Sequence, residues 1–228
     1  PATVEGIPAI EDALAEGINI NVTLMFSVEI YRQVAHAYIA GLRRYRDAGG
    51  DVSKVASVAS FFVSRVDTKV DKYLDAIGTD AALAARGKAA IANAKEAYHS
   101  FNEIFGGADF ADLRSAGARV QRCLWASTST KNPAYSDVLY VDELIGPQTI
   151  NTLPIETINA FLDHGRVALT LDGDMRTSTE ALRAVEAAGV SMERVTSELI
   201  DEGVASFQKS VDDLIATIDS KRKELTPA

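Results

Sequence analysis

Residues 18–27 read Ile-Asn-Ile-Asn-Val-Thr-Leu-Met-Phe-Ser, and this stretch decides how we interpret the rest of the chain. Its short length and strand-forming residues predict a buried β-strand. Alternate side chains of a strand share a face, so Asn21 and Thr23 are expected to point the same way. The opposite face would carry Val22, Leu24 and Phe26. Two polar side chains on one face of a buried strand indicate either a hydrogen-bonded pair in the core or an active site.

Further apolar runs and helical patterns lie on both sides of this strand. Short apolar runs predict strands at 55–62, 120–126 and 149–153. Amphipathic patterns with capping residues predict helices at 7–16, 27–47, 66–77, 79–105, 110–115, 135–145 and 155–163. The chain from residue 177 onward is also expected to be helical, with breaks at Gly189 and Gly203.

Strands that alternate with helices are typical of parallel βα units, which build (β/α)8 barrels and open doubly wound sheets. No G-x-G-x-x-G or P-loop motif follows a strand, and this absence disfavours a nucleotide-binding open sheet. We therefore predict an α/β fold of the (β/α)8 TIM barrel type. Because we find four strands where a barrel has eight, residues 1–228 would form about half of a single barrel domain.

The composition disfavours two classes of partner. A formal net charge of -9 argues against a nucleic acid or an anionic membrane as the main partner. Cys123 is the only cysteine, which excludes an internal disulfide and a multi-cysteine metal site. No run approaches the roughly 18 apolar residues of a membrane span, and no signal segment is recognisable. We expect a soluble, cytoplasmic protein without membrane contact.

An arginine and two hydroxyl groups lie at or just beyond the end of the strand at 55–62. Arg65 lies three residues past its end, with Ser60 and Ser64 nearby. A guanidinium group with adjacent hydroxyls suits a phosphate or a carboxylate, because it offers paired donors in a fixed geometry. The alternative is a surface arginine that pairs with Asp67.

Lys131 lies in the polar loop after the strand at 120–126, among serines and threonines. A desolvated lysine at this place would form a Schiff base with a carbonyl substrate. A lysine among hydroxyls would instead bind phosphate, and an ordinary exposed loop lysine is the third interpretation. His36, His99 and His164 have no second ligand at metal-binding spacing, so we predict no metal site. We also expect no cofactor.

Five segments closely resemble transaldolases, in particular the longer bacterial form of that family. These segments are 1–6 (PATVEG), 19–27 (NINVTLMFS), 60–67 (SFFVSRVD), 125–133 (WASTSTKNP) and 149–154 (TINTLP). They occur in the order of the family, and the resemblance extends from Pro1 to the end of the chain.

The resemblance implies a (β/α)8 barrel enzyme of the pentose phosphate pathway, a transferase of carbohydrate metabolism. Such an enzyme moves a dihydroxyacetone unit between sugar phosphates through a lysine Schiff base. Sedoheptulose 7-phosphate and glyceraldehyde 3-phosphate thereby give erythrose 4-phosphate and fructose 6-phosphate. Of the residues in this chain, Asn21 would bind the dihydroxyacetone part and Thr23 would hold the catalytic water.

The resemblance also implies a set of substrate-binding residues. Phe62 would line the site, and the substrate phosphate would be held by Ser60, Arg65 and Lys131. The family more often has an arginine at the position of Lys131, so the charge is retained here while the paired donors are lost.

The family's Schiff-base lysine is expected two residues upstream of Pro1, on a strand that precedes this chain. The chain would then supply strands five to eight of the barrel, with the helices of 177–228 packed on it. Its partners would be sugar phosphates, the upstream half of the same barrel and, in a homodimer, a second copy. Two alternatives stay open: a different Schiff-base aldolase that uses Lys131, and a non-catalytic half-barrel that retains phosphate affinity.

Overall fold

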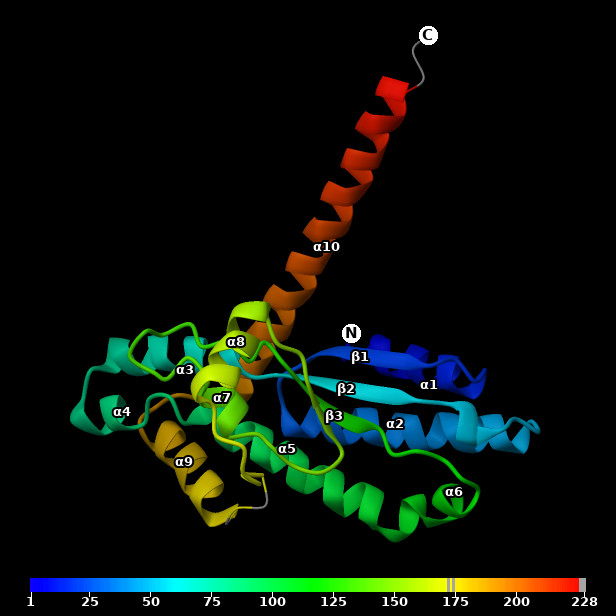
Figure 1. Ribbon diagram of the computed structural model, residues 1–228, viewed down its shortest axis with the longest axis horizontal. Helices are drawn as coiled ribbons and strands as arrows, with labels where there is room; N and C mark the ends of the chain where they lie inside the picture. Colours follow the sequence, from blue (N-terminus) through cyan, green and yellow to red (C-terminus); the bar gives the residue numbers. More distant parts are fainter. Residues whose placement is uncertain (172, 174, 226–228) are drawn as a thin grey trace.

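A four-stranded parallel sheet organises the structure, a computed structural model that describes residues 1–171, 173 and 175–225 (Figure 1). The strands follow one another in the sheet in chain order: β1 (Ile20–Met25), β2 (Ser57–Phe62), β3 (Arg122–Ala126) and β4 (Thr149–Asn151). Every neighbouring pair is parallel. The prediction of an α/β fold with a parallel sheet is therefore confirmed.

Ten α-helices connect and cover the described strands. They are α1 (Gly6–Ala15), α2 (Val28–Asp47), α3 (Ser64–Ile77), α4 (Asp80–Ala84), α5 (Ala89–Gly106), α6 (Ala111–Ser115), α7 (Leu139–Asp142), α8 (Ile155–His164), α9 (Met175–Ala187) and α10 (Met192–Leu225). Ser27 caps α2 as expected, because its Oγ accepts a hydrogen bond from the Ile30 amide at 3.1 Å.

The two faces of the sheet differ in burial. One face lies against helices, including α2 and α5, which run along one side of the sheet in Figure 1. Its side chains are at most 1% exposed: Val22, Ala59, Phe61, Cys123 and Trp125. The other face is more open, since Asn21 and Arg122 are exposed and Phe62 is half-buried. Burying the apolar face supplies most of the driving force for this layer arrangement.

The sheet does not close into a barrel within the described residues. β1 and β4 are its two edges there, so the assignment of this chain to strands five to eight stays a prediction. One contact marks the free side of β1: the Ala2 amide donates to the Thr23 carbonyl oxygen at 2.8 Å. The segment before α1 therefore already lies beside β1.

Two predicted helices are wrong in extent. The expected helix at 79–105 is divided into α4 and α5, because Gly87 between them takes a left-handed conformation with φ of 68°. The expected helix at 135–145 shrinks to the four residues of α7. The chain before α7 instead makes separate turns. The Tyr135 amide donates to the Asn132 carbonyl oxygen, and the Leu139 amide donates to the Ser136 carbonyl oxygen.

The predicted break at Gly203 is also wrong, whereas Gly189 does end a helix with φ of 99°. α10 continues through Gly203, because the missing side chain allows close contact with β1. A Cβ atom at this position would lie 2.7 Å from Leu24 Cδ2. The last three residues of the expected C-terminal region 177–228 lie outside the described residues.

Beyond Gly203, α10 projects away from the rest of the fold (Figure 1). This part carries apolar side chains at three- and four-residue spacing, which is the pattern of a helix face that packs against a partner. They are Val204, Phe207, Val211, Leu214, Ile215 and Ile218, and each is at least 40% exposed. We call these six residues the α10 stripe.

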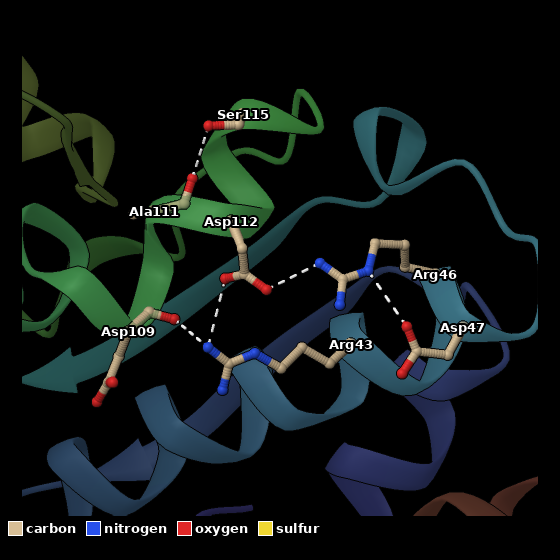
Figure 2. A network of polar contacts seen from close by, with 7 residues as sticks. All are labelled: Arg43, Arg46, Asp47, Asp109, Ala111, Asp112 and Ser115. Carbon is tan, nitrogen blue, oxygen red and sulfur yellow. Dashed lines mark hydrogen bonds and ion pairs between the residues drawn. The ribbon is translucent and has the colours of Figure 1, made fainter.

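An ion-pair network joins the end of α2 to α6 (Figure 2). Asp112 accepts from Arg46 at 2.8 Å and from Arg43 at 3.3 Å. These two guanidinium groups lower the pKa of Asp112 from its ordinary value of 3.8 to about 2. The network joins α2 to α6, the last helix before β3, and contains none of the residues predicted for the site.

Asp112→Asn is expected to lower the free energy of unfolding by at most about 1 kcal/mol at pH 7 and low salt, because all three side chains are partly exposed. The lowered pKa means that this contribution is present above about pH 4 and is lost as the pH falls through about 2. Urea unfolding in dilute buffer and in about 1 M salt tests it. A loss that does not change with salt would contradict the ion-pair explanation.

Candidate active site

A β-bulge lies at the end of β1, beside the predicted catalytic residues. Val22 pairs with Ala59 and Met25 with Phe61, so two residues of β1, Thr23 and Leu24, face one residue of β2. Leu24 has a positive φ of 58°, which is unusual for a residue with a side chain. The extra residue breaks the strand alternation that the sequence predicted.

This bulge corrects the expected face of the strand. Val22 and Met25, rather than Val22, Leu24 and Phe26, occupy the helix-covered face. Leu24 turns toward Gly203 of α10. Phe26 instead packs against Phe62, with the ring centroids 5.3 Å apart.

Asn21 and Ser60 are brought together across β1 and β2. The Ser60 hydroxyl donates to Asn21 Oδ1 at 2.6 Å. Ser60 is 4% exposed, whereas Asn21 is exposed and Thr23 is half-buried. The Thr23 hydroxyl makes no hydrogen bond to any residue that the structure describes. The alternative of a buried polar pair at Asn21 and Thr23 is therefore wrong, and both side chains are accessible to a ligand or a water.

Arg65 is exposed in the first turn of α3, where its guanidinium carbon lies 4.9 Å from the centre of the Phe62 ring. The alternative pairing with Asp67 is wrong, since Asp67 is only 1% exposed and binds Ala90 and Tyr140 instead. Arg65 makes no ion pair with any residue in the described part of the chain. Its positive charge is thus available to an anion.

Lys131 is also exposed, in the loop after β3. Its Nζ donates to Ser129 Oγ at 2.6 Å, and it borders a cavity of about 360 Å³ with Pro154 and Thr157. This setting is solvated and lacks the apolar walls that a Schiff-base lysine would need. No hydrogen bond or ion pair within the described residues joins Lys131 to the other predicted site residues.

The loops after β2 and β3 lie side by side where these strands end. The Val63 and Ser64 amides donate to the carbonyls of Ala126 and Ser127, each at 2.9 Å. The Ser64 and Ser127 hydroxyls are 3.0 Å apart. This contact brings the start of the Lys131 loop next to the turn of α3 that carries Arg65.

Comparison with known proteins identifies the family. The family described as Transaldolase/Fructose-6-phosphate aldolase matches residues 1–218. The chain belongs to this family. It is 52% identical to a transaldolase of Mycolicibacterium smegmatis and 53% identical to one of Thermobifida fusca, each over 94% of this chain. A Streptomyces coelicolor protein named Transaldolase 2 is 46% identical over the whole chain.

The transaldolase relatives are longer than this chain. The matched part makes up 58% of the M. smegmatis protein, 59% of the T. fusca protein and 62% of the S. coelicolor protein. The chain therefore spans about three-fifths of the length of the curated transaldolases it matches.

A buried acidic pair in this family member was missed by our sequence analysis. Asp67 and Asp71 lie one turn apart on α3 and are 1% and 8% exposed. Tyr140 and Tyr135 bind them through their hydroxyl groups, at 2.9 and 2.7 Å. The i,i+4 spacing of the aspartates was a visible signal, but such a pair is more often part of a solvated helix face.

The environment of Asp67 raises its pKa from the ordinary value of 3.8 to about 6. Burial is the main cause, because it penalises the charged form, and the negative charge of Asp71 adds to it. The hydrogen bonds from the Ala90 amide and the Tyr140 hydroxyl act in the opposite direction. In turn, burial and the charge of Asp67 raise the pKa of Tyr140 far above its usual range.

Asp67→Asn is expected to remove a pH dependence of stability. The folded wild type holds the Asp67 proton more tightly than the unfolded chain does, so its free energy of unfolding falls as the pH rises from about 4 to about 6. The fall from this one group is at most about 3 kcal/mol. Denaturant unfolding of both proteins at pH 4 and pH 7 measures it. Asp75→Asn, on the exposed side of α3, should retain the full fall, and an identical pH profile for Asp67→Asn would contradict the prediction.

Within the described residues, no group of histidine, cysteine, aspartate and glutamate side chains is arranged to hold a metal ion. In the same part of the chain, no helix is both long and apolar enough to cross a membrane.

Proposed function

We propose that this chain is part of a transaldolase that transfers a dihydroxyacetone unit between sugar phosphates through a lysine Schiff base. The observation that carries the proposal is the 52% identity to a curated transaldolase over 94% of the chain. The accessible polar groups at the end of β1 and β2 support it. We infer that the substrates are those of the pentose phosphate pathway, and that the reaction occurs in the cytoplasm.

The roles of the residues follow from their chemistry. Asn21, polarised by the Ser60 hydroxyl at 2.6 Å, would bind the dihydroxyacetone hydroxyls. Thr23, whose hydroxyl has no partner among the described residues, would hold the water that relays protons. Arg65 and Lys131 would neutralise the charge of the substrate phosphate, and Ser60 would help to hold it. The Phe62 ring would hold the Arg65 guanidinium by stacking against it.

We further propose that the nucleophilic lysine belongs to polypeptide that precedes Pro1. The bond from the Ala2 amide to the Thr23 carbonyl, at 2.8 Å, supports this position. A residue just before Ala2 would continue along the free edge of β1, within reach of Asn21 and Thr23. A strand there would also satisfy the unpaired backbone groups of that edge.

The remaining part of a barrel is the partner that we propose for this chain. About two-fifths of the M. smegmatis transaldolase lies outside the match, enough for the four strands that a closed barrel still needs. To close the barrel, such a part would cover the free edges of β1 and β4, and the α10 stripe is a further surface that it would cover. A second copy of the assembled barrel, in a homodimer, is a further possible partner.

Borohydride trapping with fructose 6-phosphate tests the proposal on two polypeptides. One is the 228-residue chain, and the other is a chimera in which the unmatched part of the M. smegmatis transaldolase precedes it. Reduction fixes the imine between a lysine and the ketose, so intact mass and peptide mapping locate the adduct. We expect an adduct only in the chimera, on a lysine upstream of Pro1.

The same experiment separates the alternatives. An adduct on Lys131 in either polypeptide would assign the chain to a different aldolase, and Lys131→Gln would then abolish it. A chimera that folds and binds sugar phosphate without forming any adduct would favour a non-catalytic half-barrel.

A further inference from the structure

Buried and partly buried hydrogen bonds join α3 to the Lys131 loop, and the proposed reaction does not itself use them. Arg65 lies in the first turn of α3, and Asp67 and Asp71 follow on the buried side of the same helix. Residues one helical turn apart share a face, so the two carboxylates point toward the same neighbours.

Each carboxylate accepts one hydrogen bond from a backbone amide and one from a tyrosine hydroxyl. Asp67 accepts from the Ala90 amide at 2.7 Å and from the Tyr140 hydroxyl at 2.9 Å. Asp71 accepts from the Gly87 amide at 3.0 Å and from the Tyr135 hydroxyl at 2.7 Å. Both oxygens of each carboxylate are therefore bound, one to the chain at the start of α5 and the other to a tyrosine.

The bond between Tyr135 and Asp71 attaches the C-terminal end of the Lys131 loop to α3. Tyr135 lies four residues beyond Lys131, in a segment with little regular structure. The near end is held by the contact between the Ser64 and Ser127 hydroxyls at 3.0 Å. Both ends of the Lys131 loop are thus attached to α3, the helix that carries Arg65 in its first turn.

Lys131 lies near the acidic pair but makes no ion pair with it in the described part of the chain. Lys131, Asp71 and Tyr135 border one cavity of about 310 Å³, yet Lys131 donates to Ser129 and makes no ion pair with any residue in the described ranges. The Tyr135 hydroxyl occupies Asp71 Oδ2 instead. Without this hydroxyl, Asp71 would gain a free acceptor that attracts the nearby ammonium group.

We propose that Asp67 and Asp71 are positioning residues which, through Tyr140 and Tyr135, hold Lys131 at a fixed distance from Arg65 and free to bind the substrate phosphate. This inference rests on the proposed function, because it assigns Arg65 and Lys131 to one phosphate. It adds four residues that do not touch the substrate but determine how tightly its phosphate is bound.

Tyr135→Phe tests the inference, with Tyr73→Phe as the matched control. Tyr73 lies on α3 itself, and its hydroxyl donates to Glu198 of α10 at 2.6 Å, away from the Lys131 loop. Calorimetric titration of the 228-residue chain with inorganic phosphate is the first readout. We expect Tyr135→Phe to weaken phosphate binding about tenfold and Tyr73→Phe to change it less than twofold, with both variants folded by circular dichroism.

Kinetics in the chimera form the second readout. Tyr135→Phe should raise the KM for fructose 6-phosphate about tenfold and leave kcat within twofold. The KM for glyceraldehyde, an acceptor without phosphate, should not change, whereas a merely structural defect would affect both substrates.

Equal losses on both substrates would overturn the inference, as would unchanged phosphate affinity in Tyr135→Phe or no phosphate binding by the wild type. A tenfold loss of phosphate binding in a protein without transaldolase activity would instead overturn the proposed function and leave the positioning role in place.

Discussion

Arg65→Ala is expected to lower kcat/KM for fructose 6-phosphate about a hundredfold, mostly through KM. Arg65 is exposed, stacked on Phe62 and without an ion pair among the described residues, so its full charge faces the solvent that a phosphate would replace. Charge-assisted hydrogen bonds contribute about 1.5–3 kcal/mol each, and about 2.7 kcal/mol corresponds to a hundredfold change in rate. Steady-state kinetics of the chimera measure this effect.

The control substrate for Arg65 is glyceraldehyde, whose kcat/KM should change by less than threefold. Arg32→Ala is the control variant, because Arg32 is a partly exposed arginine that pairs with Glu103 at 2.7 Å on another part of the surface. Arg65→Lys should recover part of the affinity, since it restores the charge without the paired donors. Similar losses for phosphorylated and unphosphorylated substrates would refute the role of Arg65 as a phosphate ligand.

Thr23→Ala is expected to lower kcat about a hundredfold while the Schiff base still forms. A positioned group that takes part in proton transfer contributes about 10²–10⁴-fold to the rate. Thr23 sits in the bulge of β1 and its hydroxyl has no protein partner in the described residues. Its removal therefore leaves no protein group unpaired and should cost little stability.

Two measurements on the chimera separate the role of Thr23 from a folding defect. Borohydride trapping should give the same yield of adduct in Thr23→Ala as in the wild type, with only turnover reduced. Thr23→Ser keeps the hydroxyl group and should retain most of the activity. Loss of adduct formation in Thr23→Ala would mean that the side chain acts in imine formation and not in the proton relay.

The strands and the long helices could be predicted because their signals are local. The run at 18–27 has the composition of a strand, and Ser27 lies where it can cap the next helix. The parallel arrangement followed from the alternation of these elements. Helix ends at glycine were less predictable. Gly87 interrupts a helix through its backbone conformation, whereas Gly203 allows close packing inside one.

The members of the candidate site stay a prediction, and the sequence did not indicate their geometry. Asn21, Ser60, Phe62, Arg65 and Lys131 were named from the sequence, whereas the hydrogen bond between Asn21 and Ser60 joins residues 39 positions apart. The stacking of Arg65 on Phe62 likewise depends on how α3 leaves β2. Such contacts are set by strand register and helix direction, which no short segment specifies.

By itself, the sequence determined the types of the elements and their order, and it predicted a set of residues for a sugar-phosphate site. Only the tertiary structure decided the bulge at Thr23, the face on which Leu24 lies and the burial of Asp67 and Asp71. The reason is physical. Periodicity and capping act between residues a few positions apart, while register, burial and the pKa of Asp67 depend on segments that meet only after the chain has folded.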